Sequence, residues 1–330
     1  MFTIVITTVI ADRRALPLRI DFQAAGARCV LSSNSDSVLQ IAAQPGRHEG
    51  QIGHATFEME VVVDPARDDA AECGTFFRGI KHLVFAFLPP RSLVTYDLLR
   101  RRVHAELSTA AASDPCFWRM LLLPITVGVL GTTVGIAPMH CACLERQGSG
   151  LLIAGRSGAG KSTLTAALGR MGYTLLSDDW TYISKRESAL IAHGLSAPVK
   201  LLTDSARFFP ELASLTPASA LNGELAYQVN PEFLGCPATE ISSPNWIFFL
   251  ERTSTSGCRM IPCRSEYARN FFEESAERLP DEIPEAKATR AAVIRALSAR
   301  PAWIIRTGET PQATAQALDA FLSEERYGTL

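Results

Sequence analysis

The chain has 330 residues, of which 47% are hydrophobic, enough for about two domains with substantial cores. Its 32 Lys and Arg nearly balance its 34 Asp and Glu, which argues against a nucleic acid or an anionic membrane as partner. Eight cysteines without paired C-x-x-C spacing favour neither a disulfide scaffold nor a structural zinc site. We therefore expect a globular cytoplasmic protein.

The N-terminal part alternates β-branched runs with turn signals, which predicts strands. A helix is predicted near Tyr96 to Leu107, with the basic run Arg100 to Arg102 on its solvated face. We expect residues 1–136 to form a sheet-rich α/β domain. Its strands are predicted at MFTIVITTVI, which starts at Met1, and at LPLRIDF, ATFEMEVVVDP and HLVFAFLPP.

An apolar segment from Met120 to Met139 runs for 20 residues without a charge, about the length that spans a bilayer. Its two prolines, three glycines and three threonines favour a buried helix over a membrane span. Ser113 is suited to cap that helix and Pro115 to its first turn. The sequence therefore predicts a buried helix near residues 113–134, packed between domains.

A phosphate-binding signature, GRSGAGKS, runs from Gly155 to Ser162 and satisfies the G-x-x-x-x-G-K-S pattern in full. The apolar run LLIA before it reads as a buried strand, and apolar residues at helical spacing follow it. Backbone amides of this loop would surround phosphate oxygens, Lys161 would reach the terminal phosphates, and the Ser162 hydroxyl would bind Mg²⁺. The nucleotide-binding residues are predicted to be Gly155, Arg156, Ser157, Gly158, Ala159, Gly160, Lys161, Ser162 and Thr163. ATP is the expected donor, with GTP or another phosphoryl donor as the alternative.

Two adjacent aspartates, Asp178 and Asp179, follow soon after this signature. The helix after Lys161 carries the chain ~16 Å from the phosphates at about 1.5 Å per residue. Gly172 can end that helix, and the strand that leads to Asp178 returns roughly 17 to 20 Å. Because the two lengths nearly cancel, both aspartates are predicted beside the nucleotide. Successive strand residues face opposite ways, so both serve the site only if the strand ends there.

The aspartates can divide the chemistry, since one can hold Mg²⁺ while the other accepts the proton of an attacking hydroxyl. The alternative is a turn with an N-cap role. His140 is placed near them by a hairpin centred between Gly148 and Ser149, which would pair residues 140 and 157; an ordinary core or surface histidine is the alternative. Cys141 and Cys143 are expected to be packing residues.

The segment MHCACLERQGSGLLIAGRSGAGKSTLTAALGRMGYTLLSDDW resembles the catalytic domain of HPr kinase/phosphorylase and its kinase-like relatives. The resemblance covers about 40 residues: a histidine strand, a glycine turn, a strand, the phosphate loop, a helix and the Asp-Asp pair. It implies an α/β fold in which residues 137–330 form a P-loop catalytic domain of the HPr kinase and PEP-carboxykinase type.

The resemblance also implies roles for individual residues. Asp178 would be the base for the acceptor hydroxyl, Asp179 would hold Mg²⁺ with Ser162, and His140 would lie at the edge of the site. Some relatives phosphorylate a serine on a precursor peptide. Thr163 stands where the regulatory enzymes show glutamate, and their Arg-Gly-rich signature is absent, so a kinase without phosphorylase activity fits better. Lys200 in PVKL and Arg252 are candidate additional cations.

The expected function is ATP-dependent phosphorylation of a hydroxyl on a peptide, a protein or a small molecule. The alternatives are a small-metabolite P-loop kinase, a nucleotide-dependent ATPase or switch, and a module that binds nucleotide without catalysis. Homo-oligomerisation is possible. Acceptor choice is expected to lie in loops such as Asn222 to Gly235. Further along, helices are predicted at YARNFFEESAERL, near Glu285 to Ala299 and after Thr310, with a strand at AWIIRTG.

Overall fold

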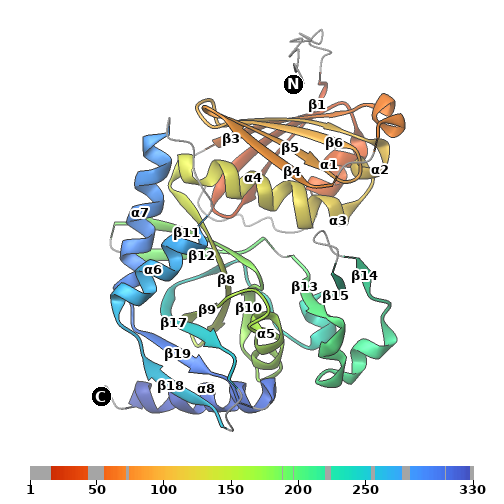
Figure 1. The fold of residues 1–330 in the computed structure, drawn as a ribbon. Coiled ribbons are helices and arrows are strands. Elements are labelled where there is room, and N and C mark those ends of the chain that lie inside the picture. The colour runs from red at the N-terminus through yellow and green to blue at the C-terminus, as the bar shows by residue number, and fades with distance from the viewer. Residues whose placement is uncertain are drawn as a thin grey trace, which may run out of the picture.

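The computed structural model describes residues 16–43, 56–71, 74–187, 189–195, 197–219, 224–253, 257–276, 283–308 and 310–327. The strand predicted at Met1 to Ile10 and part of the Asn222 to Gly235 loop lie outside these ranges. The fold is mixed α/β, and its described strands form a seven-stranded, a nine-stranded and a three-stranded sheet (Figure 1).

The seven-stranded sheet has the order β1-β2-β3-β7-β6-β5-β4. The helix predicted near Tyr96 to Leu107 is wrong, because side chains there alternate between the core and the surface with the period of a strand. Of the basic run, Arg100 and Arg101 lie in the turn between two strands, where Arg101 has a φ of 55°, and Arg102 begins the second strand. The elements are β1 (Leu18–Ala24), β2 (Ala27–Ser33), α1 (Asp36–Ala42), β3 (Thr56–Val63), β4 (Phe76–Ile80), β5 (Leu83–Leu88), β6 (Ser92–Asp97) and β7 (Arg102–Leu107).

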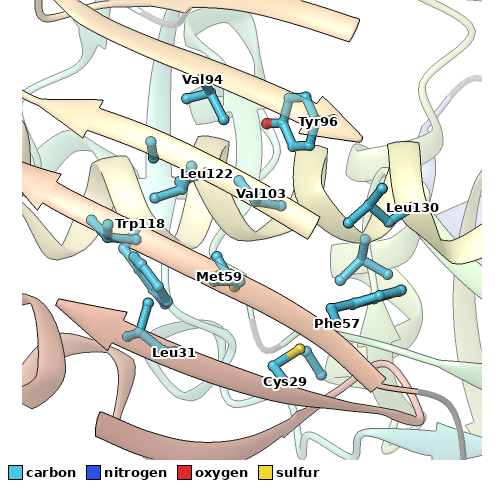
Figure 2. Packing of buried hydrophobic residues seen from close by; sticks show 14 of the residues in the cluster. Cys29, Leu31, Phe57, Met59, Val94, Tyr96, Val103, Trp118, Leu122 and Leu130 are labelled. Atoms are coloured by element: carbon cyan, nitrogen blue, oxygen red, sulfur yellow. The ribbon is translucent and has the colours of Figure 1, made fainter. Parts of the chain in front are cut away.

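The predicted apolar helix covers the inner face of this sheet (Figures 1 and 2). The segment Pro115–Val134 is long and apolar enough to cross a membrane, yet more than half of it is buried inside the protein. Trp118, Leu122 and Leu130 face the sheet in Figure 2. The segment comprises α3 (Pro115–Phe117), a π-helical stretch (Trp118–Leu122), α4 (Leu123–Leu130) and a 3₁₀ turn (Gly131–Val134), and the short α2 (Thr109–Ala112) precedes it.

The predicted cap of this helix is wrong by one residue. The carboxylate of Asp114, rather than the hydroxyl of Ser113, accepts a 2.8 Å hydrogen bond from the Cys116 amide. Pro115 occupies the first turn as expected. Ser113 instead ends α2.

The nine-stranded sheet has the order β16-β12-β11-β8-β9-β17-β19-β18, and β10 pairs with β8. Because β9, β17 and β19 are mutually parallel, their carboxyl ends meet at one edge of the sheet, where α/β proteins bind ligands. The strands are β8 (Ile136–Arg146), β9 (Ser149–Ala154), β10 (Thr174–Ser177), β11 (Trp180–Arg186), β12 (Ala189–His193), β16 (Ile241–Ser242), β17 (Pro244–Glu251), β18 (Arg259–Pro262) and β19 (Ala302–Arg306).

Helices cover both faces of this sheet (Figure 1). One face packs against α5 (Lys161–Arg170) and α8 (Pro311–Tyr327), and the other against α6 (Ser265–Ser275) and α7 (Pro284–Ser298). The C-terminal helices and the strand β19 therefore lie where the sequence predicts them. The Thr310 hydroxyl caps α8 by accepting a 3.1 Å hydrogen bond from the Ala313 amide.

The small third sheet has the order β13-β15-β14 and lies beside α5 (Figure 1). Val199 and Leu201 of its first strand are fully buried in the same cluster as Leu164 and Leu168 of α5. The strands are β13 (Val199–Leu202), β14 (Ala218–Ser219) and β15 (Leu225–Val229), accompanied by 3₁₀ turns at Thr203–Arg207, Pro210–Ser214 and Pro231–Leu234.

The seven-stranded and nine-stranded sheets share a continuous apolar cluster. Tyr182 of β11 is buried in the cluster beneath the seven-stranded sheet, and its hydroxyl donates a 3.0 Å hydrogen bond to the Pro124 carbonyl. The turn between β1 and β2 also reaches the larger sheet, because Gly26 packs directly on the His193 ring. The division into domains at residue 137 stays a prediction.

Candidate active site

The segment from Gly155 to Ser162, here the glycine loop, connects the buried end of β9 to α5 and includes the first two residues of that helix. Gly158 and Gly160 have φ values of 75° and 98°, which side chains with a Cβ rarely adopt. Gly155 is restricted by space, since a Cβ there would lie 3.0 Å from the Leu250 carbonyl oxygen. The glycines are therefore required by backbone shape and by close packing.

Lys161 and Arg252 both bring positive charge to the glycine loop. The Lys161 ammonium is buried and donates a 3.0 Å hydrogen bond back across the loop to the Gly155 carbonyl. Arg252 follows β17, and its guanidinium lies 3.7 Å from the position that a Cβ on Gly160 would occupy. The parallel pairing of β9 with β17 explains why Arg252 reaches the same edge as the loop.

The helix α5 ends as predicted, and the chain turns back toward the loop. Gly172, with a φ of 88°, follows the helix, and the Tyr173 amide donates to the Leu168 carbonyl at 3.2 Å while the Gly172 amide donates to Gly169 at 3.0 Å. These two bonds form a Schellman motif, in which a left-handed glycine ends the helix. The return strand β10 stops at Ser177.

Asp178 and Asp179 lie in the interruption between β10 and β11. Both strands pair with β8, and the pairs Ser177 with Cys143 and Trp180 with His140 bracket the two aspartates. The backbone therefore bends at the acidic pair, as the sequence requires for both residues to face one site. The strand pairing does not end there, however, because β11 continues to pair with β8 after the two aspartates.

Asp178 is buried against the glycine loop. Its Oδ2 accepts a 3.1 Å hydrogen bond from the Lys200 amide, whereas its Oδ1 is buried without a hydrogen-bond partner among the described residues. Burial, followed by the charge of Asp179, raises the pKa of Asp178 to about 7 against the opposing effects of Lys200, Ser162 and Lys161. A carboxyl group with such a pKa can accept a proton near neutral pH.

Asp179 has a different environment, because its side chain is 61% exposed and its Oδ1 lies 2.9 Å from His140 Nε2. Partial desolvation acts to raise the pKa of Asp179, but His140 and the charges of Lys161 and Lys200 outweigh it and lower that pKa. The His140 ring in turn stacks on Trp180, with ring centroids 5.2 Å apart. The two carboxyl groups are thus driven toward different protonation states.

The predicted centre of the hairpin is wrong by one position, which shifts the partner of each residue by two, although His140 lies beside Asp179. Cys141 pairs with Ala154, and Arg146 with Ser149, so the turn is centred between Gln147 and Gly148. Ser157 lies beyond the end of β9 and pairs with no residue of β8. The chain needs only a two-residue turn because Gln147 adopts a positive φ of 52°.

Lys200 contributes to the site in a way that its residue type does not indicate, because the contact to Asp178 comes from its backbone amide. Its ammonium group forms a 2.8 Å ion pair with Glu224. Trp180 was likewise missed, although its position directly after Asp179 was a usable signal. Cys141 and Cys143 are fully buried in the core, consistent with packing residues.

The oxygen atoms at this site fit a magnesium ion of the kind that nucleotides bring with them. The buried Oδ1 of Asp178, which has no hydrogen-bond partner in the part of the chain that the structure describes, belongs to a carboxyl group near the side chain of Ser162. The exposed carboxylate of Asp179 is next in the chain. Among the described residues no group of three or more His, Cys, Asp and Glu side chains could hold a metal by itself. Mg²⁺ commonly needs only one or two carboxylates, since phosphates and water supply the other ligands.

Comparison with known proteins found likeness in structure but none in sequence. No family model and no curated protein matched the sequence. Among solved structures, the HPr(Ser) kinase/phosphatase from Coxiella burnetii matched with a TM-score of 0.33 and 14% sequence identity, over 57% of this chain and 98% of that one. A likeness of this degree carries no argument about function, which must come from the site.

Proposed function

We propose that this chain is a kinase that transfers the γ-phosphoryl group of ATP to a hydroxyl, with serine on a peptide or protein as the favoured acceptor. One observation carries the proposal: the buried Asp178 carboxyl group, whose Oδ1 has no hydrogen-bond partner among the described residues, is close enough to Lys161 and Ser162 of the glycine loop for both to lower its pKa. A proton acceptor and a phosphate cradle thus face the same space.

In the proposed reaction, the acceptor oxygen forms a bond to the γ-phosphorus while the bond from that phosphorus to the β,γ-bridging oxygen breaks and ADP leaves. The hydroxyl proton passes to Oδ1 of Asp178. Lys161 and Arg252 stabilise negative charge on the phosphoryl oxygens. Ser162 and Asp179 would hold Mg²⁺, which supplies further charge neutralisation when bound. His140 holds the Asp179 carboxylate in place.

The experiment is a stoichiometry measurement with γ-labelled ATP, Mg²⁺ and a panel of serine peptides and small alcohols. We expect one labelled acceptor for each ADP formed. Asp178→Asn should lower transfer by about 100-fold or more while nucleotide binding persists. The matched control is Asp204→Asn, which changes an exposed carboxylate and should leave the rate unchanged.

Three results would contradict the proposal. Release of inorganic phosphate at the same rate with and without every acceptor indicates an ATPase or switch. Transfer by Asp178→Asn at the wild-type rate shows that Asp178 is not the base that accepts the hydroxyl proton. Nucleotide binding without any turnover indicates a binding module and contradicts the proposal as well.

A further inference from the structure

The free edge of strand β13 faces the proposed base. β13 is a terminal strand of the three-stranded sheet and pairs with β15 on one side, where Lys200 lies opposite Gln228. The Lys200 amide nevertheless donates to Oδ2 of Asp178 at 3.1 Å and so points away from β15. Asp178 therefore occupies the position that a neighbouring strand would take opposite Lys200.

The backbone of Leu202 points to the same edge. Amides along a strand alternate between its two sides, so residues two apart share a side. The Leu202 amide has no hydrogen-bond partner outside the strand ladder among the described residues, and its side chain is 37% exposed. An unpaired strand edge of this kind is a template for an extended chain.

We propose that the free edge of β13 binds the acceptor as an extended peptide, which pairs with Leu202 and presents a serine or threonine hydroxyl to Asp178. This inference rests on the proposed kinase function. Because Asp178 fills the place opposite Lys200, strand pairing ends at Leu202. Successive strand residues are ~3.3 Å apart, so the hydroxyl-bearing residue, two positions or about 7 Å along the peptide, turns out of the strand line and meets the Asp178 carboxyl group. Because the exposed Leu202 side chain is apolar, an apolar side chain is favoured at the peptide residue that pairs with Leu202.

Leu202→Pro provides a selective test because its structural effect is confined to one donor. Leu202 has a φ of −62°, which is the value that proline fixes, and the preceding residue lies in extended strand. Proline would thus remove the edge amide and leave the pairing with β15 intact. Leu202→Ala is the matched control, since it shortens the side chain and keeps the amide.

The probe is a mixture of ten-residue peptides with a fixed central serine and degenerate flanks, from which the best substrate is sequenced and resynthesised. Leu202→Pro should raise its KM by roughly 5- to 10-fold, the expected effect of one lost hydrogen bond, without changing the KM for ATP. Leu202→Ala should change the peptide KM less. With the wild-type enzyme, N-methylation of the peptide residue two positions from the serine should raise KM similarly, which avoids any effect on enzyme folding.

The outcomes separate this inference from the proposed function. If label is transferred to peptides but neither Leu202→Pro nor N-methylation changes KM, the strand-edge inference is wrong and the kinase function stands. If only free small alcohols are phosphorylated, the acceptor class is wrong. If no acceptor is labelled and phosphate is released to water, both proposals fail.

Discussion

Nε2 of His140 lies 2.9 Å from Oδ1 of Asp179, at the bend where the acidic pair leaves the strand pairing with β8. This contact fixes the exposed carboxylate of Asp179, while the neighbouring Asp178 is buried and held by a backbone amide. One histidine and one amide, from two different sheets, thus give adjacent aspartates different surroundings.

The contact predicts that His140→Gln raises the Mg²⁺ concentration that phosphoryl transfer requires. Without the imidazole, the Asp179 carboxylate is less well oriented, and partners of this kind commonly change metal affinity by 10-fold or more. We expect half-maximal transfer to require roughly 10-fold more Mg²⁺, measured by titrating MgCl₂ at fixed ATP. His104→Gln, on the outer face of the seven-stranded sheet, is the control. An unchanged magnesium curve would separate His140 from the metal.

The position of Arg252 beside Gly160 predicts a role in phosphoryl transfer. Arg252→Ala should reduce kcat by about 100-fold, because charge that develops on the phosphoryl oxygens loses one donor. Nucleotide affinity should fall much less, since Lys161 and the loop amides remain. Arg259→Ala, at an exposed position on β18, should have no effect. A loss of nucleotide affinity with an unchanged kcat would place Arg252 in ground-state binding instead.

The buried His193 predicts acid sensitivity of folding. Burial, with a smaller effect from the charge of Arg186, lowers the pKa of His193 to about 4, against an ordinary value of 6.5. Between these values the unfolded chain binds the proton that the folded protein excludes, so the free energy of unfolding falls as pH falls from 6.5 toward 4. The full contribution is roughly 3 kcal/mol and is retained above pH 6.5.

Denaturant titrations at several pH values will measure this effect. His193→Gln keeps a partner for the Ser184 hydroxyl, which lies 3.1 Å from His193 Nε2, and should flatten the slope between pH 6.5 and 4.5. His82→Gln, at a partly exposed position, should retain the wild-type slope. A slope that persists in His193→Gln would assign the acid sensitivity to other groups.

The packing of α5 predicts that Gly169→Ala destabilises the protein. A Cβ at Gly169 would lie 2.2 Å from Cys236 Sγ, so the better helix propensity of alanine is outweighed by an overlap that costs about 1–3 kcal/mol. Adding Cys236→Ala should recover much of that loss. Thermal or denaturant unfolding of the four proteins in the double-mutant cycle measures the coupling, and strictly additive effects would contradict the contact.

The local sequence from His140 to Trp180 was enough to predict how the glycine loop, the helix after it and the acidic pair are arranged. Helix α5 and strand β10 are consecutive, and their lengths are set by residue counts and by Gly172, so the return of Asp178 to the glycine loop follows from helix and strand geometry. The buried apolar helix before β8 was predictable for a similar reason, since its pattern of prolines and threonines is local.

The errors arose where a turn depends on an unusual backbone conformation. Arg101 and Gln147 adopt positive φ values without being glycine. The turn at Arg101 separates two strands where a helix is predicted, and the turn at Gln147 lies one position before the predicted centre of the hairpin. Such conformations are stabilised by strand pairing on both sides, which residue type does not reveal.

Only the tertiary structure decided which distant groups complete the site. Arg252 reaches the glycine loop because β17 is parallel to β9, and the Lys200 amide reaches Asp178 because β13 presents its unpaired edge there. These contacts join segments separated by many residues, and one of them uses a backbone atom that every residue type except proline carries. The sequence by itself therefore determined the glycine loop and the return of the acidic pair to it, whereas packing of strands remote in the chain determined what surrounds them.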